Sequence, residues 1–283
     1  MPARSKARQV EWARPDHHDC TTMTIGLYII GDEILSGKRQ DKHFARVQEL
    51  LAARGMQLGW VQYLGDDPVL LRQALQTSFG RGDVALSCGG IGATPDDHTR
   101  QSAAAALGVP LELHPEAKRL IQQRIASAGL GSPQEPANQQ RLQMGMFPQG
   151  SSIIPNPYNQ IPGFSIREHY FVPGFPVMAW PMLEWVLDGP LRSLHRHGRY
   201  LERAAIVKGA MESDLTPLME RIEREHPGVK VFSLPSVDHP QWGRHIELGV
   251  KGEPSAVEPA FDALKAGLVE LEAMVGTETV RKM

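Results

Sequence analysis

Cysteine is scarce in this chain of 283 residues, and it occurs only at Cys20 and Cys88. Two cysteines supply neither a disulfide framework nor a metal site of four thiolates, and this usage is typical of a reducing compartment. The sequence also lacks an apolar run long enough to span a membrane, and residues 1–19 contain no apolar core of a signal peptide. We therefore expect a cytoplasmic protein without a membrane partner.

Neither sign of charge dominates, since 30 lysines and arginines stand against 32 aspartates and glutamates, for a formal net charge of −2. This balance gives no electrostatic reason to expect nucleic acid as a partner, so any anion site has to be local. The length favours two domains. Residues 1–22 show no periodic apolar face, and we expect a flexible N-terminal extension there.

Strand and helix patterns alternate from Ile25 onward. Apolar runs predict strands at 25–30, 58–64, 83–87 and 169–172, and amphipathic stretches predict helices at 41–54, 67–79, 99–107, 114–128 and 178–187. This alternation predicts an α/β fold for residues 23–190, a three-layer α/β/α sandwich with a mostly parallel sheet. The segment 131–165 is rich in proline, glycine and asparagine, and we expect loops there, over the carboxyl edge of the sheet.

The composition changes after Gly189-Pro190 to a basic connector, 191–199. Beyond it, strands are expected at 204–208, 229–233 and 245–250, and helices at 213–225 and 256–275. This order predicts a small α+β, ferredoxin-like module at residues 200–283.

The most informative segment follows the strand at 83–87 and reads Gly89-Gly90-Ile91-Gly92-Ala93-Thr94-Pro95-Asp96-Asp97-His98-Thr99. Its glycines allow the backbone to approach a ligand and to direct N–H groups at one anion, while the helix expected at Thr99 adds its positive end. Asp96 and Asp97 repel a phosphate unless a hard cation lies between them, or unless they bind a neutral part of the ligand. Either arrangement predicts a phosphorylated ligand. Asp97 can also cap the helix.

A second polar loop, Gly31-Asp32-Glu33, follows the strand at 25–30, and Asp66 follows the strand at 58–64. Asp67-Pro68 is typical of a helix N-cap, which leaves Asp66 free. The carboxyl ends of parallel strands meet at one edge of a sheet, so these loops are expected to converge with the glycine loop. Arg39 could clamp a phosphate or simply be solvated.

Taken in order, five segments resemble the MoaB/MogA-like molybdopterin-binding domain, in the version found at the N-terminus of CinA-type competence/damage-inducible proteins. The five segments are 31–37, 64–67, 89–99, 155–157 and 172–176. The resemblance implies that Asp66 and Asp97 are catalytic and that Asp97, Asp66 and Asp32 hold a divalent cation such as Mg²⁺, Mn²⁺ or Co²⁺. It implies ligand contacts from Gly89, Gly90, Ile91, Gly92, Thr94, Asp96, Thr99, Gly31, Asp32, Glu33, Ser36, Pro173 and Gly174.

The expected function is to bind a phosphorylated pterin or nucleotide and to hydrolyse a dinucleotide pyrophosphate, such as ADP-ribose or FAD, with a divalent metal. Two alternatives stay open: a non-catalytic molybdopterin- or nucleotide-binding module, and adenylyl transfer to molybdopterin. Met178 stands where the family pattern has a glutamate, which favours the non-catalytic alternative. The resemblance also implies a homo-oligomer, a dimer or a trimer. This sequence stops where CinA proteins continue into a deamidase domain, so deamidase activity is not expected from it.

Overall fold

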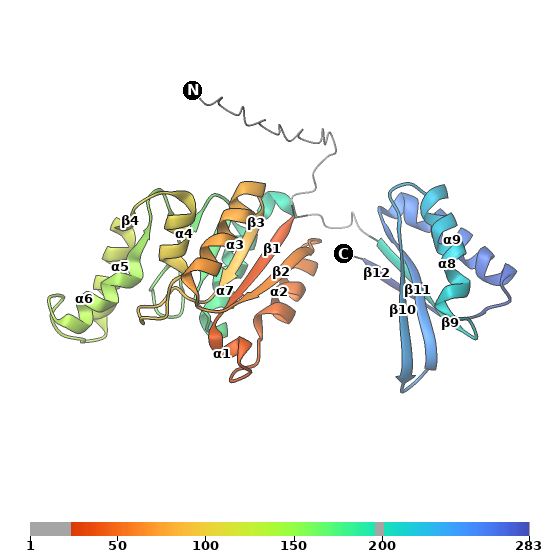
Figure 1. Ribbon diagram of the computed structural model, residues 1–283, viewed down its shortest axis with the longest axis horizontal. Coiled ribbons are helices and arrows are strands. Elements are labelled where there is room, and N and C mark those ends of the chain that lie inside the picture. Colours follow the sequence, from red (N-terminus) through yellow and green to blue (C-terminus); the bar gives the residue numbers. More distant parts are fainter. Residues whose placement is uncertain (1–23, 196–200, 283) are drawn as a thin grey trace, which may run out of the picture.

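A computed structural model describes residues 24–195 and 201–282 of the chain. The predicted flexible extension at residues 1–22 lies outside the described residues. Figure 1 shows the alternation of strands and helices in the first part, followed by a second, smaller sheet with two helices beside it. Within the described residues, no helix is both long and apolar enough to cross a membrane.

The larger sheet has six strands in the order β2-β1-β3-β8-β7-β6. Its parallel strands are β1 (Ile25–Ile30), β2 (Leu58–Leu64), β3 (Val84–Cys88) and β8 (His169–Val172). At one side β7 (Gly163–Ile166) and β6 (Ser152–Ile154) add antiparallel strands, so the sheet is mixed. The carboxyl ends of the four parallel strands consequently lie along one edge, as predicted.

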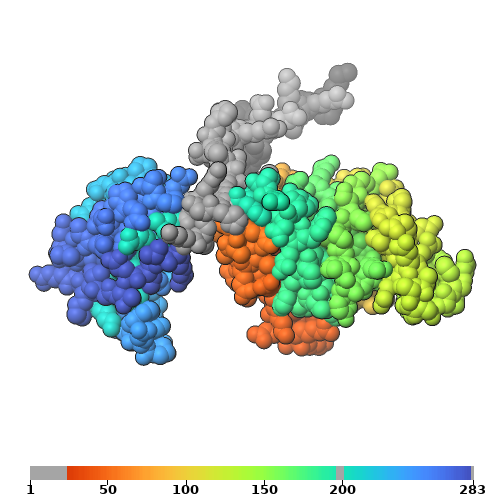
Figure 2. All heavy atoms as spheres, turned by 180° about the vertical axis from the view of Figure 1, so that it is seen from behind, coloured from red at the N-terminus to blue at the C-terminus, as the bar shows by residue number. Residues whose placement is uncertain are grey.

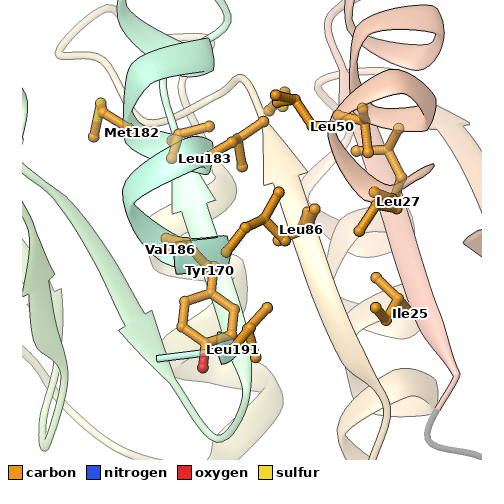
Figure 3. Packing of buried hydrophobic residues seen from close by; sticks show 14 of the residues in the cluster. Ile25, Leu27, Leu50, Leu86, Tyr170, Met182, Leu183, Val186 and Leu191 are labelled. Atoms are coloured by element: carbon orange, nitrogen blue, oxygen red, sulfur yellow. The ribbon is translucent and has the colours of Figure 1, made fainter. Parts of the chain in front are cut away.

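Both faces of this sheet are buried, because alternate residues of a strand point to opposite faces. Ile25, Leu27 and Ile29 of β1 join the core formed with α2 (His43–Ala52) and α7 (Pro176–Asp188). Figure 3 shows Leu50 of α2 and Leu183 of α7 on the same side of the sheet as Leu27 and Leu86.

Tyr28 and Ile30 belong to the core on the opposite face, with residues of α3 (Pro68–Arg81) and α4 (Thr99–Leu107). The predicted three-layer α/β/α sandwich is confirmed.

The segment 131–165 differs from the expected loops. It contains α6 (Pro136–Leu142), the short helix η1 (Gln143–Gly145), β5 (Met146–Pro148), β6 and β7, and β5 pairs with β4 (Leu111–Leu113). Ahead of it lies α5 (Pro115–Ser127). The buried Asn138 ties α6 to its approach, because its Nδ2 donates to the carbonyls of Leu130 and Ser132. These short elements depend on long-range contacts, which local composition does not report.

The second sheet has four antiparallel strands in the order β10-β11-β9-β12. The chain runs through η2 (Arg192–Leu194), β9 (Leu201–Lys208), α8 (Glu212–Glu225), β10 (Lys230–His239), β11 (Gly243–Gly252), α9 (Pro254–Glu270) and β12 (Met274–Lys282). The order βαββαβ confirms a ferredoxin-like module, drawn in blue shades in Figure 2.

The helix predicted at 256–275 is too long. α9 ends at Glu270, and Glu272 adopts a positive φ of 54°, which a continuing helix excludes. The residues from Met274 onward form β12 against β9.

Candidate functional site

The glycine loop leaves β3 in a backbone conformation that requires glycine. Gly89 and Gly90 have φ values of +113° and +67°. A Cβ atom on Gly89 would collide with the backbone carbonyl of Ile30, and one on Gly90 would collide with the Thr99 hydroxyl. The loop therefore passes directly over the end of β1, as the three closely spaced glycines indicate.

Thr99 supports this loop from inside the protein. Its side chain is fully buried, its Oγ1 donates to the carbonyl of Gly89 at 3.2 Å, and its backbone N–H donates to the carbonyl of Gly90 at 3.0 Å. Two hydrogen bonds thus hold the carbonyls of the loop toward the interior. Thr99 therefore supports the loop from beneath.

Asp97 closes the second half of the loop. Its Oδ2 accepts hydrogen bonds from the backbone N–H of Thr94 at 2.9 Å and from the Thr94 hydroxyl at 2.5 Å. The alternative role of Asp97 as a helix cap is not observed, because α4 begins after His98 without a side-chain cap.

Arg100 lies under the same loop, and its guanidinium donates to the carbonyl of Gly92. Burial lowers the pKa of Arg100 to about 10, and the charge of Asp97 opposes that shift. A buried guanidinium is costly without a nearby anion. The carboxylate of Asp97 thus stabilises the cation that holds the loop.

The two loops after β1 and β2 are joined by a reciprocal pair of hydrogen bonds. The backbone N–H of Asp32 donates to Oδ2 of Asp66 at 2.9 Å, and the N–H of Asp66 donates to Oδ1 of Asp32 at 3.2 Å. Burial raises the pKa of Asp66, and the charges of Asp32, Glu33 and Asp96 add to the rise, while the hydrogen bond from the Asp32 backbone opposes it. A positive charge near Asp66 would therefore stabilise its ionised form.

The neighbouring Asp67 has a separate role. Its Oδ1 accepts from the backbone N–H groups of Val69 and Leu70 at 2.7 and 3.1 Å, at the start of α3. The predicted N-cap at Asp67 is confirmed.

A cavity of about 500 Å³ opens between these loops at the carboxyl edge of the parallel strands. Twelve of the predicted site residues line it: Gly31, Glu33, Asp66, Gly89, Gly90, Ile91, Gly92, Thr94, Asp96, Asp97, Pro173 and Gly174. Asp32, Ser36 and Thr99 are not in its wall. Asp32 is hydrogen-bonded to Asp66, and Thr99 lies beneath the glycine loop. Ser36 directly follows the short helix α1 (Asp32–Leu35), which lies between β1 and α2 in the chain.

Several wall residues were not among the expected ligand contacts. Asn156 and Asn159 come from the segment between β6 and β7, and Met178 comes from α7. The Nδ2 of Asn156 donates to the carbonyl of Ile161 at 3.0 Å, and the Nδ2 of Asn159 lies 3.3 Å from Sδ of Met178. The sequence signals for this wall are the cluster of turn residues at 155–159, which includes the family-like segment 155–157, and the departure from the family pattern at Met178.

The wall carries mostly negative charge. Glu33, Asp66, Asp96 and Asp97 contribute four carboxylates, and Arg39 contributes a guanidinium whose Cζ lies 5.9 Å from the ring centroid of Phe175. An anionic ligand in such a cavity requires a cation or a neutral face toward the carboxylates.

Oxygen donors of this kind fit Mg²⁺, which proteins commonly hold through one or two carboxylates together with ligand phosphates and water. Of the three predicted metal ligands, Asp66 and Asp97 reach the cavity and Asp32 does not. Across residues 24–195 and 201–282, no group of three or more His, Cys, Asp or Glu side chains is placed to hold a metal ion. A cation here would therefore depend on the ligand for further donors.

Comparison with known sequences assigns the part of the chain that carries this site to a protein family. The sequence model of the family described as "Probable molybdopterin binding domain" matches residues 26–193. A CinA-like protein of Myxococcus xanthus is 31% identical over 268 residues, which cover 90% of this chain and 60% of that protein. A CinA-like protein of Anaeromyxobacter sp. is 32% identical over 197 residues, or 67% of this chain and 47% of that protein.

The chain thus spans about half to three fifths of these CinA-like relatives, whereas a protein of Pyrobaculum calidifontis is 29% identical over 88% of this chain and 95% of its own length. Among solved structures, the protein CinA of Thermoplasma acidophilum, whose function is described as unknown, has a TM-score of 0.51 and 24% identity. It covers 58% of this chain and 97% of its own chain. This likeness concerns the fold.

Proposed function

Because the chain belongs to the family described as "Probable molybdopterin binding domain", we propose that its cavity binds a phosphorylated pterin or nucleotide and hydrolyses a dinucleotide pyrophosphate such as ADP-ribose or FAD. The observation that carries the proposal is the cavity of about 500 Å³, whose wall combines the glycine loop with four carboxylates. A loop of this kind suits a phosphate, and hard oxygen donors suit the divalent cation that accompanies a pyrophosphate.

In this mechanism the backbone N–H groups of the glycine loop hold the pyrophosphate and stabilise the charge that develops on its oxygens. Asp97 and Asp66 each use Oδ2 within the protein, and their Oδ1 atoms are the donors we assign to the cation. The cation, when bound, supplies electrophilic activation of the phosphoryl group and lowers the pKa of an attacking water. Arg100 and Thr99 bind carbonyl groups of the loop. The N–H of Gly89 donates to the carbonyl of Val172, and the N–H of Thr94 donates to Asp97. The N–H groups that we assign to the ligand are therefore those of Gly90, Ile91 and Gly92.

One observation favours a second candidate, a binding module without catalysis. Met178 lies in the cavity wall, at the position where the family pattern has a glutamate, so the carboxylate that this pattern would add beside a cation is missing. Its thioether faces the amide of Asn159 at 3.3 Å, and a thioether is a poor ligand for hard cations. Such a site would retain a pterin or a nucleotide and release it unchanged.

Turnover with and without metal separates the two candidates. The purified protein is incubated with ADP-ribose or FAD, with Mg²⁺, Mn²⁺, Co²⁺ or a chelator, and the products are followed by chromatography and mass. Release of AMP that depends on metal supports the hydrolase. Binding of the same nucleotides without turnover under any metal refutes the hydrolase and leaves the binding module.

We propose in addition that the protein acts in the cytoplasm as a homo-oligomer. Exposed apolar residues on α7 support an interface there, since Val177 and Trp185 are 54% and 45% exposed. Light scattering on the purified chain tests this proposal, and a monomer at micromolar concentration refutes it.

A further inference from the structure

A second cavity, of about 330 Å³, adjoins the first. The two share Ile30, Glu33, Arg39 and Gly174 in their walls. The second cavity alone includes Lys42 and His43 at the start of α2, together with Cys88 at the end of β3. In Figure 2 the segment that contains α1 and α2 is drawn in red-orange shades, and part of the atoms in these shades project at the bottom of the larger body.

His43 carries an unused hydrogen-bonding atom inside the protein. Its Nε2 lies 3.0 Å from the carbonyl oxygen of Gly174. A carbonyl only accepts, so Nε2 carries the hydrogen, and in the neutral ring Nδ1 is then an acceptor. His43 is only 5% exposed, and its Nδ1 has no hydrogen-bond partner within residues 24–195 and 201–282. Buried polar atoms are normally paired, so an unpaired acceptor on a residue of the cavity wall is a candidate partner for a donor of a bound ligand.

The two cavities differ in charge. The first has four carboxylates and one guanidinium, whereas the second has Glu33 alone against Arg39 and Lys42. The second cavity therefore attracts an anionic group without the help of a metal ion.

Cys88 does not turn this cavity into a thiol site. It is buried, and its burial raises the pKa of the thiol. A thiol that keeps its proton is neither a nucleophile nor a ligand for a metal. The polar chemistry of the cavity is thus set by His43, by the two cations Arg39 and Lys42, and by the carboxylate of Glu33.

We propose that the second cavity binds a sugar phosphate, namely one half of a dinucleotide, whose phosphate is the part of the pyrophosphate that lies nearer to this cavity. Nδ1 of His43 accepts a hydrogen bond from a sugar hydroxyl, and Lys42 pairs with the phosphate. The inference rests on the proposed function for the position of the remainder of the ligand. It adds a site that selects for the sugar, which the glycine loop, as a phosphate-binding element, does not contact.

Two substitutions of His43 separate contact with the ligand from support of Gly174. In His43→Gln the amide nitrogen reaches the place of Nε2 and can still donate to Gly174, but the acceptor at Nδ1 is lost. In His43→Asn the amide oxygen takes the place of Nδ1, and the bond to Gly174 is lost. Each full-length variant is titrated in a calorimeter with ribose 5-phosphate and, separately, with inorganic pyrophosphate plus Mg²⁺. Thermal unfolding midpoints establish that both variants are folded.

We expect His43→Gln to weaken ribose 5-phosphate binding about tenfold and to leave pyrophosphate binding unaltered, because it keeps the bond to Gly174. His43→Asn should change ribose 5-phosphate binding by about twofold at most. Lys42→Met should also weaken ribose 5-phosphate binding and should reduce its dependence on salt. The inference is overturned if the wild type does not bind ribose 5-phosphate, or if His43→Asn is the weaker binder. A wild type that binds ribose 5-phosphate but not pyrophosphate with Mg²⁺ instead refutes the proposed function at the glycine loop.

Discussion

Replacement of Asp97 distinguishes a carboxylate that closes a loop from one that takes part in chemistry. Oδ2 of Asp97 accepts two hydrogen bonds from Thr94, at 2.9 and 2.5 Å. Asp97→Asn retains a carbonyl oxygen for both bonds and removes only the negative charge. Asp97→Ala removes the charge and both bonds, so the two variants differ in loop closure alone.

The expected magnitudes follow from these contacts. Asp97 is half-buried and Thr94 is exposed, so each bond contributes about 1 kcal/mol to the free energy of unfolding. Both variants lose the charge that faces Arg100, and only Asp97→Ala also loses the two hydrogen bonds. Asp97→Ala should therefore have a free energy of unfolding about 1–2 kcal/mol lower than that of Asp97→Asn. If the carboxylate holds the cation, both variants should lose about 100-fold or more in kcat/KM, which corresponds to about 2.7 kcal/mol of transition-state stabilisation.

Urea unfolding measures the first quantity, and metal-dependent release of AMP from ADP-ribose measures the second. Catalysis and stability should respond differently: the asparagine variant is more stable than the alanine variant, yet both lose activity. An Asp97→Asn protein that turns over within about twofold of the wild-type rate, in the same metal, would refute the reasoning. The carboxylate would then act only through loop closure.

Three further predictions concern other parts of the first domain. Met178→Glu places a carboxylate on the cavity wall and should raise metal-dependent turnover of ADP-ribose several-fold, whereas Met178→Gln, which lacks the charge, should not; equal effects would contradict the role of charge. Gly89→Ala should lower the free energy of unfolding in urea by about 2 kcal/mol or more, because Gly89 has a φ of +113° and faces a backbone carbonyl. Gly82→Ala, at a φ of +72° with open space around it, should lower it by only about 1 kcal/mol. Equal losses in the two variants would contradict the close approach of Gly89 to Ile30. Burial lowers the pKa of His169 to about 4 from 6.5, so below about pH 6.5 the unfolded chain binds a proton at this histidine while the folded protein does not. The free energy of unfolding should therefore fall by roughly 3 kcal/mol between pH 7 and pH 4 because of this group. A fall of the same size in His169→Phe would show that other groups cause it.

Much of the first sheet and its glycine loop could be predicted from the chain itself. The strands at 25–30, 58–64 and 169–172 have the predicted bounds, because each is a short apolar run with turn residues at its end. Gly89 and Gly90 could be assigned to a close backbone approach because glycine alone tolerates it. Once parallel strands are expected, their carboxyl ends have to share an edge, so the meeting of Gly31, Asp66 and the glycine loop needs no knowledge of side-chain contacts.

Segments whose structure depends on distant partners could not be predicted in this way. Residues 131–165 look like loops, yet β5 forms against β4, and β6 and β7 extend the main sheet. In the second module, β12 exists because β9 offers an open edge more than 60 residues earlier in the chain. Local composition carries no record of such partners.

The sequence by itself determined the class of the fold, the position of the glycine loop and the set of carboxylates near it, since these follow from local periodicity and from the steric freedom of glycine. Only the tertiary structure decided which of those side chains are free. It turns Asp32 toward Asp66, buries Thr99 beneath the loop and brings His43 to Gly174, 131 positions away along the chain. The assignment of each polar atom to a partner inside the protein or to a ligand depends on packing between such distant segments.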